Sequence, residues 1–153
     1  MDDNADHFYL ADQLLTEAGF QHYEISNYAQ PGCESQHNQA YWAGHDYLGL
    51  GPSAVPTVGN KRWQNVPDTG RYAQHGPSPI NEETLTEIDL HNERVALMLR
   101  TSAGIHIDSL SETSRQRAHE LQSEGLLEFV EGHCRLTKAH LAMVDPIAAE
   151  LFV

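Results

Sequence analysis

The sequence predicts an α/β unit followed by a mainly α-helical unit, because its residue pattern changes twice along the 153 residues. Apolar residues recur at helical spacing over 4–18, and a segment at 21–28 then alternates apolar and polar residues as a strand does. Gly, Pro and aromatic residues dominate 29–80, and helical patterns return from residue 82 onward. We therefore expect one unit at 1–80 and another at 82–153.

The first predicted helix carries an apolar stripe formed by Phe8, Ala11, Leu15 and Ala18, which Leu14 widens. The glycine that follows suits the left-handed position at which helices end. A helix in an α/β unit normally follows a strand, and none precedes this one. We therefore expect that the chain was cut from a larger α/β fold.

The segment 29–80 is expected to be irregular, with short strands such as one at residues 47–50. Long irregular segments in compact domains are more often functional than decorative. The functional site is therefore expected in this segment.

Residues 84–87, Thr-Leu-Thr-Glu, match a capping box and predict a helix that runs to about Arg100. Ile88, Val95 and Leu99 mark the side of this helix that is expected to be buried.

A second helix is expected to begin after Ser111 or Thr113, carry Ala118 and Leu121, and end at a glycine, residue 125. A hairpin with Glu131-Gly132 at its turn follows. Thr137 is expected to cap a last helix, and Asp145-Pro146 is expected to restart or kink it. The order helix, helix, hairpin, helix is that of a winged-helix module.

The charge balance argues against nucleic-acid binding and against strong association with an anionic membrane surface. The chain has 9 Lys and Arg against 22 Asp and Glu, a formal net charge of −13, whereas phosphate backbones and anionic lipids attract clustered cations. We expect the winged module to be structural or to dock a partner protein. The polar, acidic N-terminus is unlike a secretory signal, and no apolar run approaches the roughly 20 residues that span a bilayer. A cytoplasmic location is therefore expected.

Only two cysteines are present, Cys33 and Cys134, about a hundred residues apart. They form no C-x-x-C pair, so they predict neither a disulfide framework nor an autonomous iron–sulfur or zinc site. The ten histidines are scattered along the chain.

The most informative stretch is residues 37–42, His-Asn-Gln-Ala-Tyr-Trp. If it is helical, His37 and Tyr41 share one side and Asn38 and Trp42 share another. An imidazole can ligate haem iron and aromatic rings can stack on a porphyrin, so these four residues are the candidate haem site, with His37 as the candidate iron ligand. The alternative is structural: Tyr41 and Trp42 would anchor a core while His37 and Asn38 bind loop carbonyls.

No catalytic residue is assigned. The glycine-rich run at 49–54 lacks the third glycine and the acidic residue of a dinucleotide fingerprint. The serines lack the context of a nucleophile elbow, and Glu24 has no evident carboxylate partner.

Three runs in order, YEISNYAQPG at 23–32, HNQAYW at 37–42 and DYLGLG at 46–51, resemble the HemW family of haem chaperones, which are similar to oxygen-independent coproporphyrinogen III oxidases. The Asn-Glu-Arg run at 92–94 and Leu-Thr at 136–137 are similar to the C-terminal domain of that family. The resemblance covers essentially the whole chain but only the C-terminal portion of the family.

The resemblance implies that residues 1–80 are the last part of a radical-SAM partial TIM-like barrel with its closing loops, and that residues 82–153 are a winged-helix-like domain. It implies haem or porphyrin as ligand and a haem-acceptor protein as partner, and it leaves dimerisation open. A [4Fe–4S] cluster and S-adenosylmethionine are implied for the full-length relative, not for this chain's own cysteines. Further pocket-lining candidates lie in or beside the matching runs: Tyr23, Glu24, Ser26, Asn27, Gly49, Gly51 and Ser53.

Two other functions stay open at this point. The parent protein could be a coproporphyrinogen III oxidase in porphyrin biosynthesis, of which this chain shapes the substrate pocket. The chain could also be a protein-docking module without a ligand.

Overall fold

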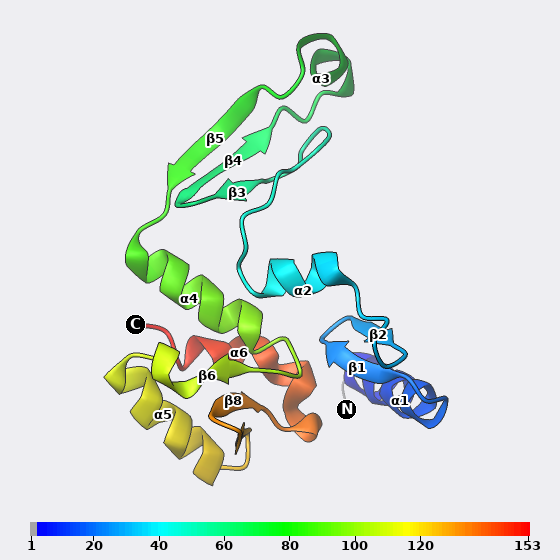
Figure 1. Ribbon diagram of the computed structural model, residues 1–153, viewed down its shortest axis with the longest axis vertical. Helices are drawn as coiled ribbons and strands as arrows, with labels where there is room; N and C mark the ends of the chain where they lie inside the picture. The colour runs from blue at the N-terminus through cyan, green and yellow to red at the C-terminus, as the bar shows by residue number, and fades with distance from the viewer. Residues whose placement is uncertain (1–2) are drawn as a thin grey trace.

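The computed structural model describes residues 3–153, and its first group of elements packs a helix beside a short antiparallel hairpin (Figure 1). Helix α1 spans Asp3–Glu17, strand β1 Gln21–Glu24 and strand β2 Asn27–Ala29. The expected single strand over 21–28 is therefore wrong. The chain reverses direction at 25–26, where the Glu24 carboxylate accepts hydrogen bonds from the Ser26 N–H, at 2.9 Å, and from the Asn27 side chain.

The apolar stripe expected on α1 is wrong in part. Phe8 is half-buried, but Ala11, Leu14 and Ala18 are exposed. Among the described side chains of this helix, the buried one is Asp12. The face that α1 turns inward is thus built around a carboxylate.

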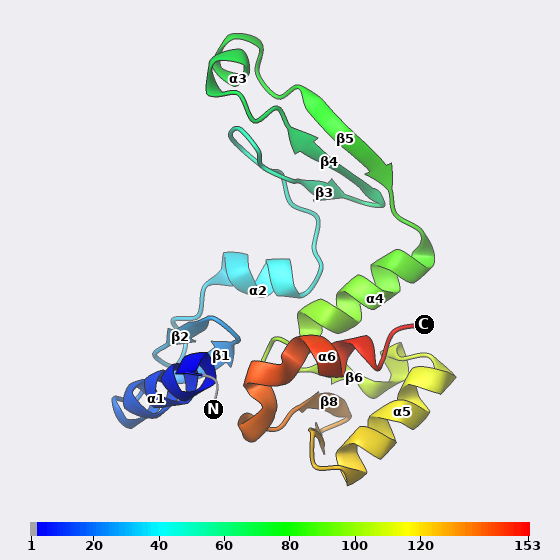
Figure 2. The same ribbon diagram turned by 180° about the vertical axis from the view of Figure 1, so that it is seen from behind.

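The second group is an arm that extends away from the rest of the chain (Figures 1 and 2). Strands β3 (Thr57–Val58), β4 (Lys61–Asn65) and β5 (Pro79–Thr84) form an antiparallel sheet in the order β3-β4-β5, and helix α3 (Thr69–His75) connects β4 to β5. The segment 29–80 is therefore more regular than expected. The strand expected at 47–50 is absent from the described residues, since within that run only Tyr47 pairs, with Thr57. All six residues of β5 are exposed, so it lacks the alternation that marks a half-buried strand.

Two helices join the arm to the other groups (Figure 1). Helix α2 (Gln36–Trp42) precedes the arm, and α4 (Glu87–Met98) follows it. The N-cap of α4 is Thr86, whose capping-box partner is Asp89, two residues later than the capping box expected at 84–87. Val95 is fully buried as expected, whereas Ile88 is exposed.

The third group follows α4. It contains β6 (Ile105–His106), the short helix η1 (Ile107–Ser109), α5 (Glu112–Ser123), β7 (Leu127–Val130), β8 (His133–Leu136), η2 (Lys138–Met143) and α6 (Val144–Ala149). Its strands form an antiparallel sheet in the order β6-β8-β7. The second helix and the hairpin are confirmed, with Ser111 as the N-cap of α5.

The end of the chain departs from the expectation in detail. Thr137 occupies the N-cap position of η2, but its hydroxyl donates to the carbonyls of Gly125 and Leu126 rather than capping. Met143 is the N-cap residue of α6, and Asp145 lies inside its first turn.

The hydrophobic core lies within residues 95–151 and is formed by α4, α5, α6 and the β6-β8-β7 sheet. Gly104 lets β6 approach β8, because a Cβ at this position would lie 2.3 Å from the Cys134 carbonyl oxygen, and its φ is +70°. Ile25, from the first group, packs against this core.

Backbone hydrogen bonds join the first group to the end of α4. The Ile25 N–H donates to the Arg100 carbonyl at 2.7 Å, and the Ser102 N–H donates to the Tyr23 carbonyl at 3.1 Å. Glu24 and Thr101 form an antiparallel bridge between these two bonds. This junction places β1 against the residues that follow α4.

Replacing Leu121 with alanine should lower the free energy of unfolding by about 2–5 kcal/mol, because the side chain is 1% exposed and its removal leaves a cavity. Urea unfolding monitored by circular dichroism measures the change. The matched control is Leu50→Ala, which should change stability by less than about 0.5 kcal/mol because Leu50 is 85% exposed. Equal losses in the two variants would show that the core is not where we place it.

Candidate functional site

Helix α2 contains the four residues of the candidate haem site, which lie on two different sides of the helix. Its N-cap is Ser35, whose hydroxyl accepts a hydrogen bond from the Asn38 N–H at 3.3 Å. In a helix of this length, residues four apart share a side. His37 therefore lies with Tyr41, and Asn38 lies with Trp42.

The Asn38 and Trp42 side of α2 faces strand β1. The Asn38 side-chain amide donates to the Tyr23 hydroxyl at 3.4 Å. Trp42 lines a cavity of about 340 Å³ together with Tyr23, Glu24 and Met98. We call it the Trp42 cavity.

The His37 and Tyr41 side of α2 is more open. His37 is exposed, lines none of the cavities described here, and makes no side-chain hydrogen bond within the described residues. Tyr41 is 38% exposed and meets the Tyr47 ring edge-on, with ring centres 5.4 Å apart. Partial burial, followed by the charges of Tyr47 and Glu93, raises the pKa of Tyr41 above its ordinary value, so at neutral pH its hydroxyl remains a hydrogen-bond donor.

A smaller cavity of about 190 Å³ lies beside Tyr41, between the end of α2, strand β4 and helix α4. Arg62 and Arg94 line it, and Arg62 Nη2 donates to both oxygens of the Glu93 carboxylate. Asn92 forms two hydrogen bonds with Val153. Its side-chain Nδ2 donates to the Val153 carbonyl, and its Oδ1 accepts from the Val153 N–H. The Asn-Glu-Arg run therefore joins the chain end, the arm and this cavity.

The other pocket-lining candidates fall into two places. Tyr23 and Glu24 line the Trp42 cavity, while Ser26 and Asn27 bind the Glu24 carboxylate at the β1–β2 turn. Glu24 is 2% exposed, and its carboxylate thus accepts hydrogen bonds from residues of the same turn.

Gly49, Gly51 and Ser53 lie in the loop that precedes the arm sheet. The buried Asn65 side chain donates to the carbonyls of Gly49 and Gly51 at 2.9 and 3.0 Å, and the Gly51 N–H donates to the Tyr72 hydroxyl at 2.9 Å. Gly49 and Gly51 therefore lie around Asn65, and none of the three candidates lines a cavity that α2 lines.

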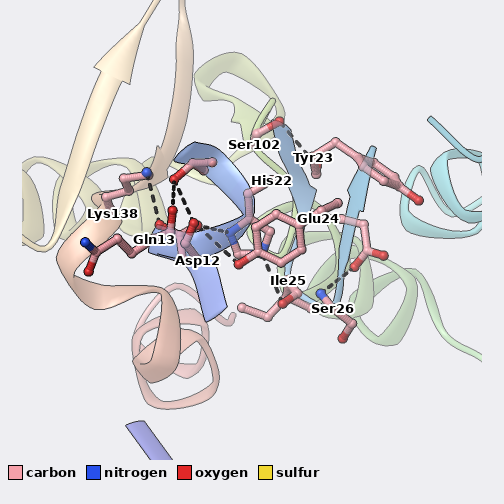
Figure 3. Close-up of polar contacts among 11 residues, drawn as sticks. Asp12, Gln13, His22, Tyr23, Glu24, Ile25, Ser26, Ser102 and Lys138 are labelled. Carbon is pink, nitrogen blue, oxygen red and sulfur yellow. Dashed lines mark hydrogen bonds and ion pairs between the residues drawn. The ribbon is translucent and has the colours of Figure 1, made fainter. Parts of the chain in front are cut away.

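A cluster that the sequence interpretation did not include lies on the other side of β1 (Figure 3). The Asp12 carboxylate contacts His22 Nδ1 at 3.2 Å, the Tyr28 hydroxyl at 3.2 Å and Lys138 Nζ at 3.1 Å. The His22 ring stacks on Tyr28 with ring centres 4.1 Å apart. The available signal was Asp12 itself, since it stands four residues after Phe8 on the inward side of α1.

Charge and burial set the protonation of this cluster. Burial by itself would raise the pKa of the Asp12 carboxyl, but the hydrogen bond and charge of Lys138, the Tyr28 hydroxyl and His22 outweigh it and place that pKa below its ordinary value. Burial and the Asp12 carboxylate raise the pKa of Tyr28 to about 12. At neutral pH the cluster therefore holds a carboxylate and a protonated phenol.

The residues present do not fit an iron–sulfur cluster. Cys33 is exposed and Cys134 is buried in the core, and they are the two cysteines of the sequence. In residues 3–153, no group of three or more His, Cys, Asp or Glu side chains could hold a metal ion. Within the same range, no helix is both long and apolar enough to cross a bilayer.

The chain is similar to proteins of known name. A family model described as the HemN C-terminal domain matches residues 85–140. The heme chaperone HemW of Mycobacterium tuberculosis is 35% identical over 155 residues, which cover 98% of this chain and 40% of that protein. The heme chaperone HemW of Lactococcus lactis is 30% identical, with 84% of this chain and 35% of that protein covered.

Two further comparisons extend this picture. A mitochondrial protein of Bos taurus, radical S-adenosyl methionine domain-containing protein 1, is 31% identical over 90% of this chain and 36% of that protein. The solved structure of coproporphyrinogen III oxidase (HemN) from Escherichia coli matches with a TM-score of 0.68 at 18% identity, over 95% of this chain and 40% of that one. At that identity the likeness shows the fold. The chain thus spans about two fifths of the length of the relatives it matches.

Replacing Asp12 with asparagine should lower the free energy of unfolding at pH 7 by about 1–3 kcal/mol, since Lys138 and His22 lose a charged acceptor. A carboxyl whose folded pKa is depressed contributes stability above its unfolded pKa, and that contribution is lost as the pH falls through the folded pKa. Because the pKa of Asp12 is lowered from 3.8, the gap between the two proteins should close as the pH falls below about 4. Unfolding curves at pH 3 and pH 7 measure it.

The matched control is Asp6→Asn on the same helix, where the side chain is exposed and forms no ion pair within the described residues. It should change stability by less than about 0.5 kcal/mol at either pH. A loss in Asp12→Asn that is as large at pH 3 as at pH 7 would contradict the ionic role of this cluster.

Proposed function

Because this chain belongs to the HemW family, whose members it matches over their C-terminal portion, we propose that it forms the haem-facing part of a protein that binds haem and delivers it to an acceptor protein. Two of its relatives carry the name heme chaperone, which supports haem as the cargo.

The observation that carries this proposal is the open side of α2. His37 offers an imidazole that is exposed and free of side-chain hydrogen bonds among the described residues, and imidazole is a common axial ligand of haem iron. Tyr41, one turn further on, offers a partly exposed ring against which a porphyrin can stack. The residues present therefore fit haem as a ligand held at the surface. A cargo at the surface can pass to an acceptor without opening the protein.

The opposite side of α2 would position this ligand. The side chain of Asn38 donates a hydrogen bond to Tyr23 and so holds the helix against β1. Trp42 lies on the same side of the helix and lines the Trp42 cavity. In this proposal Asn38 and Trp42 fix the direction in which His37 points, and Tyr23 and Glu24 support them. Gly49, Gly51 and Ser53 belong to the loop around Asn65, where they shape the arm next to the site.

We further propose that residues 1–80 are the last part of a radical-SAM barrel with its closing loops, and that residues 82–153 are a winged-helix-like domain. The likeness to the HemN structure supports the first assignment at the level of fold. The order of α4, β6, η1, α5, β7 and β8, with β8 in the centre of its sheet, supports the second.

The relative named for radical S-adenosyl methionine supports a [4Fe–4S] cluster and S-adenosylmethionine in the longer proteins. Since this chain's two cysteines do not fit a cluster, we place both groups in the portion of the relatives that the chain does not span. No step of oxidase chemistry is assigned to residues of this chain.

Replacing His37 with alanine should weaken haem binding at least about tenfold, or about 1.4 kcal/mol, because the axial bond to iron is lost. A titration with ferric haem, followed at the Soret band, measures the change. His75→Ala is the matched control, since His75 is also exposed but ends α3 in the arm. Equal affinities and equal Soret spectra in wild type, His37→Ala and His75→Ala would remove His37 from this role.

A further inference from the structure

A cavity of about 340 Å³ lies between β1 and the third group, on the side of β1 away from Trp42. Three of the chain's nine Lys and Arg residues line it, namely Arg100, Arg135 and Lys138, and His22 lies beside them. They come from three separate parts of the chain, around residues 22, 100 and 135–138, so the fold itself gathers them. Each of the three cations also contacts a carboxylate: Arg100 that of Asp145, Arg135 that of Glu128 and Lys138 that of Asp12. We call this cavity the basic cavity.

These cations keep donors available for a ligand. Arg135 uses Nε to bind the Glu128 carboxylate at 2.8 Å and Nη1 to bind the Ser102 carbonyl at 3.1 Å. Its Nη2 has no protein acceptor among the described residues. Lys138 makes one contact, to Asp12, and its side chain is 69% exposed. A guanidinium and an ammonium with unused N–H groups suit an anion, and the planar guanidinium suits a carboxylate best.

His22 lies at the edge of this cavity, between two oxygen acceptors (Figure 3). Its Nδ1 faces the Asp12 carboxylate at 3.2 Å, and its Nε2 faces the Ile25 carbonyl at 3.2 Å.

Two carboxylates, those of Glu24 and Glu128, also line the cavity, and each already has partners within the protein. Glu24 is 2% exposed, and its carboxylate accepts from the Ser26 N–H and the Asn27 amide. Glu128 is bound by Arg135. The lining also includes the apolar side chains of Ile25, Leu136 and Leu141. The cavity therefore offers both N–H donors and apolar surface to a ligand.

We propose that the basic cavity binds a small organic carboxylate whose apolar body lies against Leu136 and Leu141 and whose carboxylate is held by Arg135 and Lys138. The carboxylate can belong to a free aromatic or aliphatic acid or to a propionate arm of a porphyrin, because both present the same group on an apolar frame. This inference does not rest on haem binding at His37, since the two sites lie on opposite sides of β1.

The test uses 4-phenylbutyrate and its uncharged counterpart 4-phenylbutanol, titrated into the whole chain and followed by amide chemical shifts. We expect saturable binding of the acid with a dissociation constant below about 10 mM, and shifts at residues 100–102 and 135–138 but not at 117–124. The alcohol should bind at least about tenfold more weakly. Absence of saturable binding, equal binding of the alcohol, or shifts confined to other residues would overturn the proposal.

Variants sharpen the test. Arg135→Gln should weaken the acid at least about tenfold, whereas Arg117→Gln should leave it unchanged, because Arg117 binds Glu120, Glu124 and Glu150 elsewhere on the surface. If Arg135→Gln does not fold, the amide chemical shifts of the wild-type chain still show whether the acid binds in the basic cavity. Equal affinity in the wild type and a folded Arg135→Gln would overturn the proposal.

Coproporphyrin III and its tetramethyl ester then identify the source of the carboxylate. Competition with 4-phenylbutyrate by the free porphyrin but not by the ester supports a porphyrin propionate as the ligand. Absence of competition by either supports a free small acid. Loss of haem binding in His37→Ala, with binding of the acid unchanged, keeps the two sites separate.

Discussion

The arrangement of the site depends on the short antiparallel junction between the end of β1 and the residues that follow α4. Two backbone hydrogen bonds, from Ile25 to Arg100 and from Ser102 to Tyr23, enclose the bridge between Glu24 and Thr101. Ile25 packs against the core beside this bridge, and the Asp12–Lys138 ion pair joins the first group to the third further along. The junction therefore fixes β1, on which α2 lies, relative to the residues that follow α4.

The two sides of strand β1 contact different kinds of side chains. On one side Tyr23 and Trp42 line the same cavity, and Tyr23 accepts a hydrogen bond from Asn38 of α2, the helix on which His37 is exposed. On the other side His22 and Lys138 meet the buried carboxylate of Asp12. Alternation along a strand sends neighbouring side chains to opposite faces, and residues 22 and 23 follow it. A single strand therefore contacts both the helix that carries the exposed His37 imidazole and a buried ionic cluster.

Local patterns explain why some elements could be predicted and others could not. Helix α5 and the β7–β8 hairpin have buried residues at regular spacing and a turn of Glu131-Gly132 with positive φ at both positions, and such signals lie within a few residues of each other. Strand β5 is exposed throughout, so no alternation of apolar and polar residues in the sequence predicts the strand or its pairing with β4. The cluster around Asp12 joins residues up to 126 positions apart, from 12 to 138. The motif at 37–42 predicted its own helix, but only tertiary contacts show which side of it is open.

The central claim is that His37 is the residue that ligates haem iron, and exchanging the ligand tests it most directly. In His37→Cys the axial donor would change from an imidazole nitrogen to a thiolate sulfur, which alters the electronic structure of the bound haem. Electron paramagnetic resonance and absorption spectra of the ferric complex should then change from a histidine-ligated to a thiolate-ligated form. A complex that retains the wild-type spectrum in His37→Cys would contradict the account and place the iron on another residue.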